Sequence, residues 1–258
     1  NVIEESHSPW SSPIVPVRKN DNTLRLCIDY RRLNSVTKTE HYPMPNLESS
    51  IYSASKMKYF TSLDLVKGYY QLPLDPESKQ YTAFSTSKNH YQFRVLPFGL
   101  KNSGIAFQRA MQKIMCNFSH KNSIIYIDDL LFMSETFEEH ILLLEKALNT
   151  LMAAGTTVNI KKCQLFQEEV TFLGHEISSE GIKKSPVYIE KIKNYPRPTN
   201  VTEMRQFLGL VNFQRKFINR CSEISKPLSE KTVGPKKKEI TWNEEMNTTY
   251  EKLKEILI

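Results

Sequence analysis

The chain has 258 residues, of which 40% are hydrophobic and 24% are charged, and its formal net charge is +7. One hydrophobic core rarely serves a chain of this length, so we expect two or three packed subdomains rather than one small binding module. No segment approaches the roughly 18 to 20 apolar residues of a membrane span, and no targeting segment is visible. The scattered Cys and His residues fit neither a disulfide framework nor a zinc site, which favours a reduced, intracellular setting.

Strand-like segments dominate the first hundred residues. Two pairs of apolar or β-branched runs each flank a turn, which predicts two β-hairpins. The first pair comprises residues 14–17 and 24–28 around 20–22, and the second comprises 81–85 and 91–95 around 88–89.

Two helices are predicted in the middle of the chain. The first begins near Asn102, and its apolar residues recur at helical spacing as far as Phe118. The second begins with a capping box formed by Thr136 and Glu139 and ends at Gly155. Its expected buried stripe is Phe137, Ile141, Leu144, Leu148 and Leu151.

The C-terminal part is predicted to be helical and basic. Pro186 follows the cap Ser185 in one helix, and Asn200 with Glu203 begins another. The segment from Lys183 to Lys238 contains 14 Lys and Arg residues and four acidic residues. Its charge exceeds the net charge of the whole chain, so the rest of the chain is net acidic. Such a block suits a polyanion, because cations near phosphates release condensed counterions. The alternative is an ordinary solvated basic helix face.

Two acidic positions stand out because they interrupt apolar, β-prone runs. Asp128 and Asp129 lie in the middle of residues 123–133, which predicts a hairpin with the acids at its turn, although Asp-Asp is also ordinary turn chemistry. Asp64 ends the run 60–65. Three carboxylates at one locus would repel one another and favour a bound cation. Ligation by oxygen alone indicates Mg²⁺ or Mn²⁺.

The same residues carry a resemblance to a known family. The sequence Tyr-Ile-Asp-Asp at 126–129 resembles the Tyr-x-Asp-Asp box of reverse transcriptases, and 63–69 resembles their first aspartate motif. Further matching segments are 8–13, 25–34, 96–103 and 172–175. Residues 196–199 leading into 207–210 and 217–218 resemble the thumb of gypsy-type long-terminal-repeat retrotransposons. The matches run in family order from residue 8 to about 258.

This resemblance implies an α+β fold of the right-handed polymerase type, with fingers, a palm built on an antiparallel sheet, and a helical thumb. The implied fingers are residues 1–38 and 72–101, and the implied palm is 39–71 and 102–182. The thumb would be 183–232. Residues 233–258 resemble the incomplete start of a connection or RNase H-like region.

The resemblance also implies a catalytic site. Asp64, Asp128 and Asp129 would bind two Mg²⁺ ions, or Mn²⁺, with the backbone carbonyl of Leu65 as a further ligand. In this family one ion activates the primer 3′-hydroxyl and the other neutralises the triphosphate. An isolated acid cluster would also fit a two-metal nuclease or phosphatase, but that class leaves the matches at Arg25 and Tyr69 unexplained.

Further residues are implied to contact substrates. Arg25 and Lys19 would hold the triphosphate, Tyr69 would exclude a 2′-hydroxyl beneath the sugar, and Phe98 would pack near the nucleotide. The residues implied to contact primer or template are Tyr126, Asn102, Leu173 and Gly174; the last is also explained as an ordinary hairpin glycine. One position departs from the family, since Gly104 stands where proline is usual, which weakens the preorganisation of the following helix.

The implied function is RNA-directed DNA polymerase activity, which extends a primer on an RNA or DNA template with deoxynucleoside triphosphates (dNTPs). A protein that only binds nucleic acid, derived from such an element, is the alternative. By analogy the chain would be part of a Pol polyprotein with protease, RNase H and integrase. It would work in the cytoplasm, within a virus-like particle and without a membrane.

Overall fold

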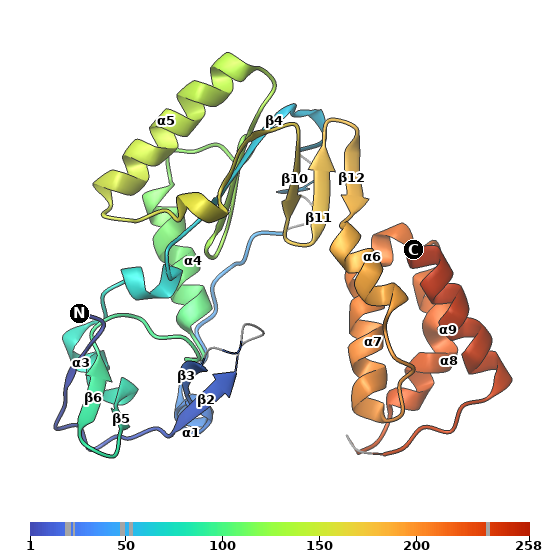
Figure 1. The fold of residues 1–258 in the computed structure, drawn as a ribbon, viewed down its shortest axis with the longest axis horizontal. Coiled ribbons are helices and arrows are strands. Elements are labelled where there is room, and N and C mark those ends of the chain that lie inside the picture. Colours follow the sequence, from blue (N-terminus) through green and yellow to red (C-terminus); the bar gives the residue numbers. More distant parts are fainter. Residues whose placement is uncertain (19–21, 23, 47–49, 52–53, 236–237) are drawn as a thin grey trace. The chain divides into compact units, whose positions relative to one another are not determined.

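The computed structural model describes residues 1–18, 22, 24–46, 50–51, 54–235 and 238–258. These residues form two compact units, which are described separately (Figure 1). The first contains residues 1–173 and 177–182, and the second contains 174–176 and 183–258. In the part of the chain that is described, no helix is long and apolar enough to cross a membrane.

The centre of the first unit is a four-stranded antiparallel sheet in the order β7-β8-β4-β9. Its strands are β7 (Ser123–Tyr126), β8 (Asp129–Ser134), β4 (Tyr59–Asp64) and β9 (Gln164–Gln167). Helices α4 (Ser103–Ile114) and α5 (Phe137–Ala153) pack on one face. The buried side chains of that layer are Leu63, Leu130 and Phe132 from the sheet with Phe107, Met111, Leu144, Ala147 and Leu151 from the helices.

A second, smaller sheet packs on the opposite face. Its strands, in the order β10-β11-β12, are β10 (Glu169–Phe172), β11 (His175–Ser178) and β12 (Gly181–Lys184). Val170, Phe172 and Ile177 share a core with Phe60, Leu131 and Met133 of the central sheet. Because neighbouring side chains on a strand point to opposite faces, the central strands are apolar on both sides, which explains their continuous hydrophobic runs.

The predicted N-terminal hairpin is confirmed. Strand β2 (Ile14–Arg18) pairs antiparallel with β3 (Leu24–Ile28). Helix α1 (Arg31–Val36) follows. A separate sheet has the order β1-β6-β5, with β1 (Ile3–Glu5), β6 (His90–Phe93) and β5 (Phe84–Ser85). Helix α3 (Pro76–Lys79) and short 3₁₀ turns at Ala54–Lys56, Gly68–Gln71, Gln80–Thr82 and Ile160–Lys162 complete the unit.

The predicted strand at 81–85 is wrong in its first half. Residues Gln80–Thr82 form a 3₁₀ turn because the hydroxyl of Thr82 donates to the carbonyl of Lys79, 2.7 Å away. The same oxygen accepts the backbone N–H of Phe93 at 2.9 Å. A threonine that bonds its local backbone in this way competes with strand pairing.

The start of the second predicted helix is confirmed, but its buried stripe is partly wrong. The capping box of Thr136 and Glu139 is present, and Leu144 and Leu151 are buried. Phe137, Ile141 and Leu148 are instead 42 to 44% exposed. The buried face of α5 is rotated toward His140 and Ala147, which pack on the sheet. The first predicted helix, α4, ends at Ile114, short of Phe118.

The second unit is helical, as expected. Helices α6 (Pro186–Lys193), α7 (Val201–Phe213), α8 (Cys221–Ser229) and α9 (Glu244–Leu257) surround one apolar core, with short 3₁₀ turns at Arg215–Phe217 and Glu230–Thr232. The core includes Ile192, Phe207, Leu228 and Leu253, one from each helix. Helix α9, from the segment 233–258, therefore contributes to the same core as the segment predicted to be the thumb.

Candidate active site

The two adjacent acids lie at a tight hairpin, as the sequence predicts. Tyr126 of β7 pairs with Asp129 of β8, so only Ile127 and Asp128 form the turn. Ile127 has a φ of 55°, which a type II′ turn requires at its first central residue and normally reserves for glycine. A β-branched residue in this conformation is an outlier, and strained residues of this kind cluster at functional sites.

The third acid reaches the same place through strand pairing. In the antiparallel ladder between β4 and β8, Asp64 lies directly opposite Asp129. Residues paired in this way have Cα atoms roughly 4.5 to 5.5 Å apart and side chains on the same face of the sheet. The structure therefore brings together Asp64 and Asp129, which are far apart in the chain, with Asp128 in the adjoining turn.

A glycine allows the segment after β4 to approach Asp128. Gly68 is buried, and a Cβ atom added to it would lie 3.0 Å from the Cβ of Asp128 and 3.4 Å from Cζ of Phe107. The contact with Asp128 is tighter than a side chain normally tolerates, whereas the distance to Phe107 is an ordinary van der Waals contact. Residue 68 must therefore lack a side chain if Asp128 is to keep its position, which gives a physical reason for the glycine in the first aspartate motif.

The acids influence one another electrostatically. Burial raises the pKa of the Asp129 carboxyl, and the nearby charges of Asp128 and Asp64 raise it further. Lys162 opposes this effect, and its ammonium lies 3.5 Å from Oδ2 of Asp64. Sequence reasoning missed Lys162, because 98 positions separate it from Asp64 and only the fold brings the two together.

The donor set fits a divalent cation, although the side chains do not form a finished cage. Within the described residues, no group of three or more His, Cys, Asp or Glu side chains is arranged to hold a metal ion. However, burial raises the pKa of Asp129 and the charges of Asp128 and Asp64 raise it further, and a bound cation relieves repulsion of this kind. Carboxylate oxygens are also the ligands that Mg²⁺ and Mn²⁺ prefer.

A pocket of about 610 Å³ opens beside these acids. Its wall contains Asp64, Asp128 and Lys162, together with Phe98. The other lining residues are Leu24, Leu26, Leu65, Lys67, Gly68 and Tyr70. The lining of the pocket thus combines two carboxylates and two lysines with apolar and aromatic side chains, a combination suited to a ligand that has both charged groups and a flat ring.

Two of the predicted nucleotide contacts lie against each other. The rings of Tyr69 and Phe98 have centroids 4.8 Å apart, and Tyr69 also meets Phe107 edge-on at 5.2 Å. Burial raises the pKa of the Tyr69 hydroxyl, with smaller contributions from the charge of Asp128 and from Tyr126. Tyr69 is therefore held by rings on two sides, close to the acids.

The predicted triphosphate contacts are less completely described. The backbone of Arg25 pairs with Val17 in the β2-β3 hairpin, and its neighbours Leu24 and Leu26 line the pocket. The side chain of Arg25 is outside what the structure describes. Lys19 lies outside the described residues altogether.

Two other predicted contacts are Leu65, which lies at a backbone bridge, and Asn102, which is bonded to backbone groups. Leu65 forms a bridge with Val158, and the two hydrogen bonds of this bridge involve Asp64 and Val66 rather than Leu65. The amide of Asn102 donates to the carbonyl of Lys38 at 3.0 Å and accepts the N–H of Glu40 at 3.2 Å. Asn102 therefore ties the segment after α1 to the start of α4.

The predicted primer grip is a tight turn. Leu173 and Gly174 connect β10 to β11, and both have positive φ, 48° and 79° respectively. Positive φ at both central residues is characteristic of a type I′ hairpin turn. A Cβ atom on Gly174 would also lie 3.2 Å from the ring of Phe213. The glycine is thus needed for the turn itself, whatever else the loop contacts.

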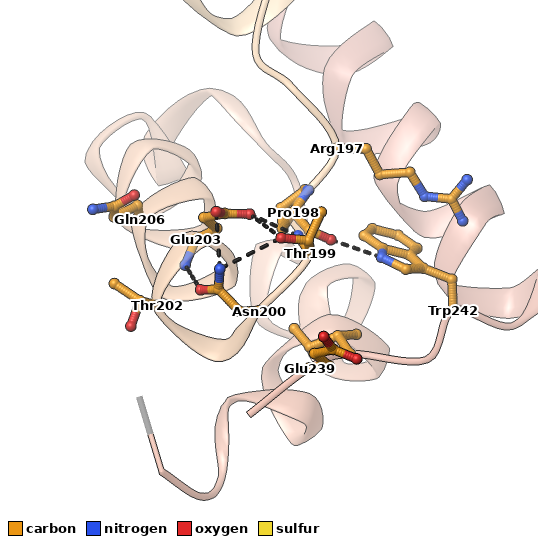
Figure 2. Close-up of a pocket in the computed structure, with 10 residues that line it drawn as sticks. Arg197, Pro198, Thr199, Asn200, Thr202, Glu203, Gln206, Glu239 and Trp242 are labelled. Carbon is orange, nitrogen blue, oxygen red and sulfur yellow. Dashed lines mark hydrogen bonds between the residues drawn. The ribbon is translucent and has the colours of Figure 1, made fainter. Parts of the chain in front are cut away.

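A pocket of about 840 Å³ in the helical unit has a structural explanation. It lies at the start of α7, where the carboxylate of Glu203 accepts the N–H and hydroxyl of Thr199 at 2.7 and 2.8 Å (Figure 2). These bonds hold the pKa of Glu203 below its usual range. The indole of Trp242 donates to the carbonyl of Pro198 at 2.8 Å, and the guanidinium of Arg197 lies over its ring. The motif at 196–199 therefore anchors α7 to the segment before α9.

The α+β fold of right-handed polymerases has a four-stranded antiparallel sheet that packs on helices and is joined to a helical unit. Its acids lie at a hairpin and on the adjacent strand, as they do here. The chain belongs to the reverse transcriptase family. Residues 17–177 match the family described as reverse transcriptase (RNA-dependent DNA polymerase).

Similar proteins agree with this assignment. The chain is 37% identical to the Pol polyprotein of transposon 297 of Drosophila melanogaster over its whole length, and 34% identical to that of transposon gypsy over 99% of it. These matches cover 25% and 26% of the relatives, so the chain spans about a quarter of their length. The foamy viral protease-reverse transcriptase, solved with double-stranded DNA, is 31% identical with a TM-score of 0.89, covering 99% of this chain and 45% of that one. Its complex with an RNA/DNA hybrid has a TM-score of 0.88 at 31% identity, and the match covers 100% of this chain and 34% of that one.

Proposed function

We propose that this chain is an RNA-directed DNA polymerase that extends a primer on an RNA or DNA template with dNTPs. The observation that carries the proposal is the in-register pairing of Asp64 with Asp129 beside the turn that holds Asp128. Family membership supports the same activity. The natural setting we propose is a Pol polyprotein working in the cytoplasm, within the particle of the element.

Asp64, Asp128 and Asp129 would hold two Mg²⁺ ions, which supply charge neutralisation at the triphosphate and lower the pKa of the primer 3′-hydroxyl. The role of the protein is then to fix three carboxylates at one place, two of which line the pocket. Lys162 adds a positive charge beside Asp64. Catalysis of this kind consists of positioning and electrostatic stabilisation.

The nucleotide would occupy the pocket between the acids and the aromatic side chains. Phe98 lines the pocket, and Tyr69 packs against Phe98 where we propose that it excludes a 2′-hydroxyl. Arg25, on strand β3, is proposed from the family resemblance to bind the phosphates through its guanidinium.

The helical unit would bind the primer and template through its charge. Its sequence from Lys183 to Lys238 has ten more basic than acidic residues. The foamy viral relatives were solved with double-stranded DNA and with an RNA/DNA hybrid, which supports a duplex as the partner here too. Binding through phosphates depends little on sequence, as copying any template requires.

The test is primer extension on an RNA template by the wild-type chain beside Asp128→Asn. We expect Mg²⁺-dependent extension by the wild type and a loss of at least about 4 kcal/mol of transition-state stabilisation in the variant, roughly a thousandfold in rate. Template binding should be preserved, because the aspartate does not contribute to the basic surface. If the wild type binds the duplex with salt-sensitive affinity but never extends it, the chain is a nucleic-acid-binding protein only. Shortened template or primer products would instead indicate a nuclease.

A further inference from the structure

One buried polar side chain beside the acidic hairpin has no role in the site described above. Gln108 lies on α4 and is completely buried. Its Oε1 accepts the backbone N–H of Ile127 at 2.6 Å, and its Nε2 donates to the carbonyl of Ile125 at 3.0 Å. A single amide thus bonds two backbone groups on the hairpin that carries Asp128 and Asp129.

Those two backbone groups need a partner from outside the hairpin. Among the residues that the structure describes, strand β7 is at the edge of its sheet and has a strand neighbour on one side only. In an antiparallel ladder the residue next to a hydrogen-bonded pair directs its N–H and C=O away from the partner strand. Ile125 lies next to the Tyr126–Asp129 pair that closes the turn, so its carbonyl faces the open edge. Gln108 fills that edge.

The bond to Ile127 acts on the strained residue of the turn. Ile127 has a φ of 55°, an unfavourable conformation for a β-branched side chain that persists only when its surroundings enforce it. The N–H held by Gln108 belongs to this residue, directly before Asp128. A turn that relaxed to ordinary φ would rotate the following peptide and move the Asp128 carboxylate.

We infer that Gln108 is a positioning residue that holds the Ile127–Asp128 turn in its strained conformation and so sets the place of the Asp128 carboxylate. This inference rests on the proposed polymerase function for its kinetic consequence, but the clamp itself is independent of it. A side-chain amide suits the position without a charge, because the two backbone groups require one acceptor and one donor, and the amide has both at the end of the side chain.

Gln108→Met tests the inference, since methionine fills a similar volume and makes neither bond. The first measurement is amide hydrogen exchange of the hairpin peptide in the absence of metal and substrate. We expect the Ile127 amide to exchange at least tenfold faster than in the wild type. The matched control is Gln112→Met, one turn further along α4, where the glutamine accepts from the hydroxyl of Tyr42 instead. The control should leave exchange at Ile127 unchanged.

The second measurement is the dependence of primer extension on Mg²⁺ concentration. For Gln108→Met we expect a roughly tenfold to hundredfold lower kcat, because a displacement of about 1 Å at a reacting group costs that much. The Mg²⁺ concentration at half-maximal rate should rise several-fold, while the Kd for primer-template stays within twofold. Gln108→Glu, which retains an acceptor for the Ile127 amide, should recover part of the exchange protection and of kcat; it also serves if the methionine variant does not fold.

Several outcomes would overturn the inference. If the folded Gln108→Met protein shows wild-type exchange of the Ile127 amide, Gln108 does not hold the turn. Faster exchange with an unchanged kcat and Mg²⁺ dependence shows that the clamp does not position the carboxylate. If the wild-type chain extends no primer, the proposed function fails, whereas the exchange experiment still decides whether Gln108 holds the turn.

Discussion

The two units of this chain carry their proposed roles in different ways. In the first unit, three carboxylates depend on individual contacts, such as the Asp64–Asp129 pairing and the approach of Gly68 to Asp128. In the second unit, 14 basic residues between Lys183 and Lys238 contribute to a charge that no single one of them defines. The first role should therefore be sensitive to the shift of one side chain, and the second should weaken gradually as charges are removed.

The most severe test of this contrast adds a single methyl group and no charge. In Gly68→Ala the new Cβ would lie 3.0 Å from the Cβ of Asp128, so the carboxylate must move by a few tenths of an ångström or more. We expect a roughly tenfold to hundredfold loss of kcat, because catalytic groups tolerate little displacement. Steady-state primer extension measures this loss, with circular dichroism as a check on folding. If the folded variant keeps the wild-type kcat, the activity does not depend on the position of this one side chain.

A second test changes specificity instead of rate. Tyr69 is held by the rings of Phe98 and Phe107. In Tyr69→Val the space beneath the sugar opens, so we expect ribonucleotide incorporation to rise at least about tenfold relative to deoxynucleotide incorporation. The measurement is the ratio of kcat/KM for the two nucleotides. An unchanged ratio would restrict Tyr69 to a packing role.

The basic unit should respond more weakly, even to a change of two charges. Lys191 and Lys193, both exposed on α6, are to be replaced together by alanine. The logarithm of the binding constant for a primer-template duplex decreases linearly with the logarithm of the salt concentration. In the double variant this slope should become shallower by about two, and the affinity should drop several-fold. The control pair is Lys88 and Lys121, exposed in the first unit. An equal effect of the control pair would show that the charge is not confined to the helical unit.

The smallest expected effect is a change in stability when a helical glycine is replaced by alanine, and this change should be similar in both units. Gly104 is in the first turn of α4, and an added Cβ would lie 3.5 Å from the hydroxyl of Tyr69, an ordinary contact. Gly104→Ala should stabilise the protein by about 0.5 to 1 kcal/mol, because alanine loses less backbone entropy in a helix. Gly209 of α7, with nothing within 4 Å of an added Cβ, provides the matched change in the other unit. Chemical denaturation measures both, and a loss of stability at Gly104 alone would indicate a hidden clash.

Local signals in the sequence predicted much of this architecture. The hairpin at 126–129, the capping box at Thr136 and the cap at Asn200 depend on neighbouring residues, so they could be recognised without a fold. The convergence of Asp64 with Asp129 was predicted from family motifs; spacing alone left it open.

Other features depend on contacts between distant segments, which a single sequence does not reveal. Lys162 reaches Asp64 across 98 positions, and Gln108 reaches Ile127 across 19. The face of α5 that becomes buried is likewise decided by the sheet it packs on, which is why Phe137, Ile141 and Leu148 are more exposed than their spacing predicted. The roles assigned to the site residues, including Arg25 and Lys19, remain predictions.

The pairing of Asp64 with Asp129 also determines where the chain tolerates a change of length. Inserting one residue within β4 would slip its register against β8 and turn the carboxylate at its end to the opposite face of the sheet. The loop between β5 and β6 is under no such constraint, and doubling its length costs only about 0.6 kcal/mol in closure entropy. Insertions and deletions that accumulate as related elements diverge should therefore be found in such loops and be absent from the two strands that carry the acids.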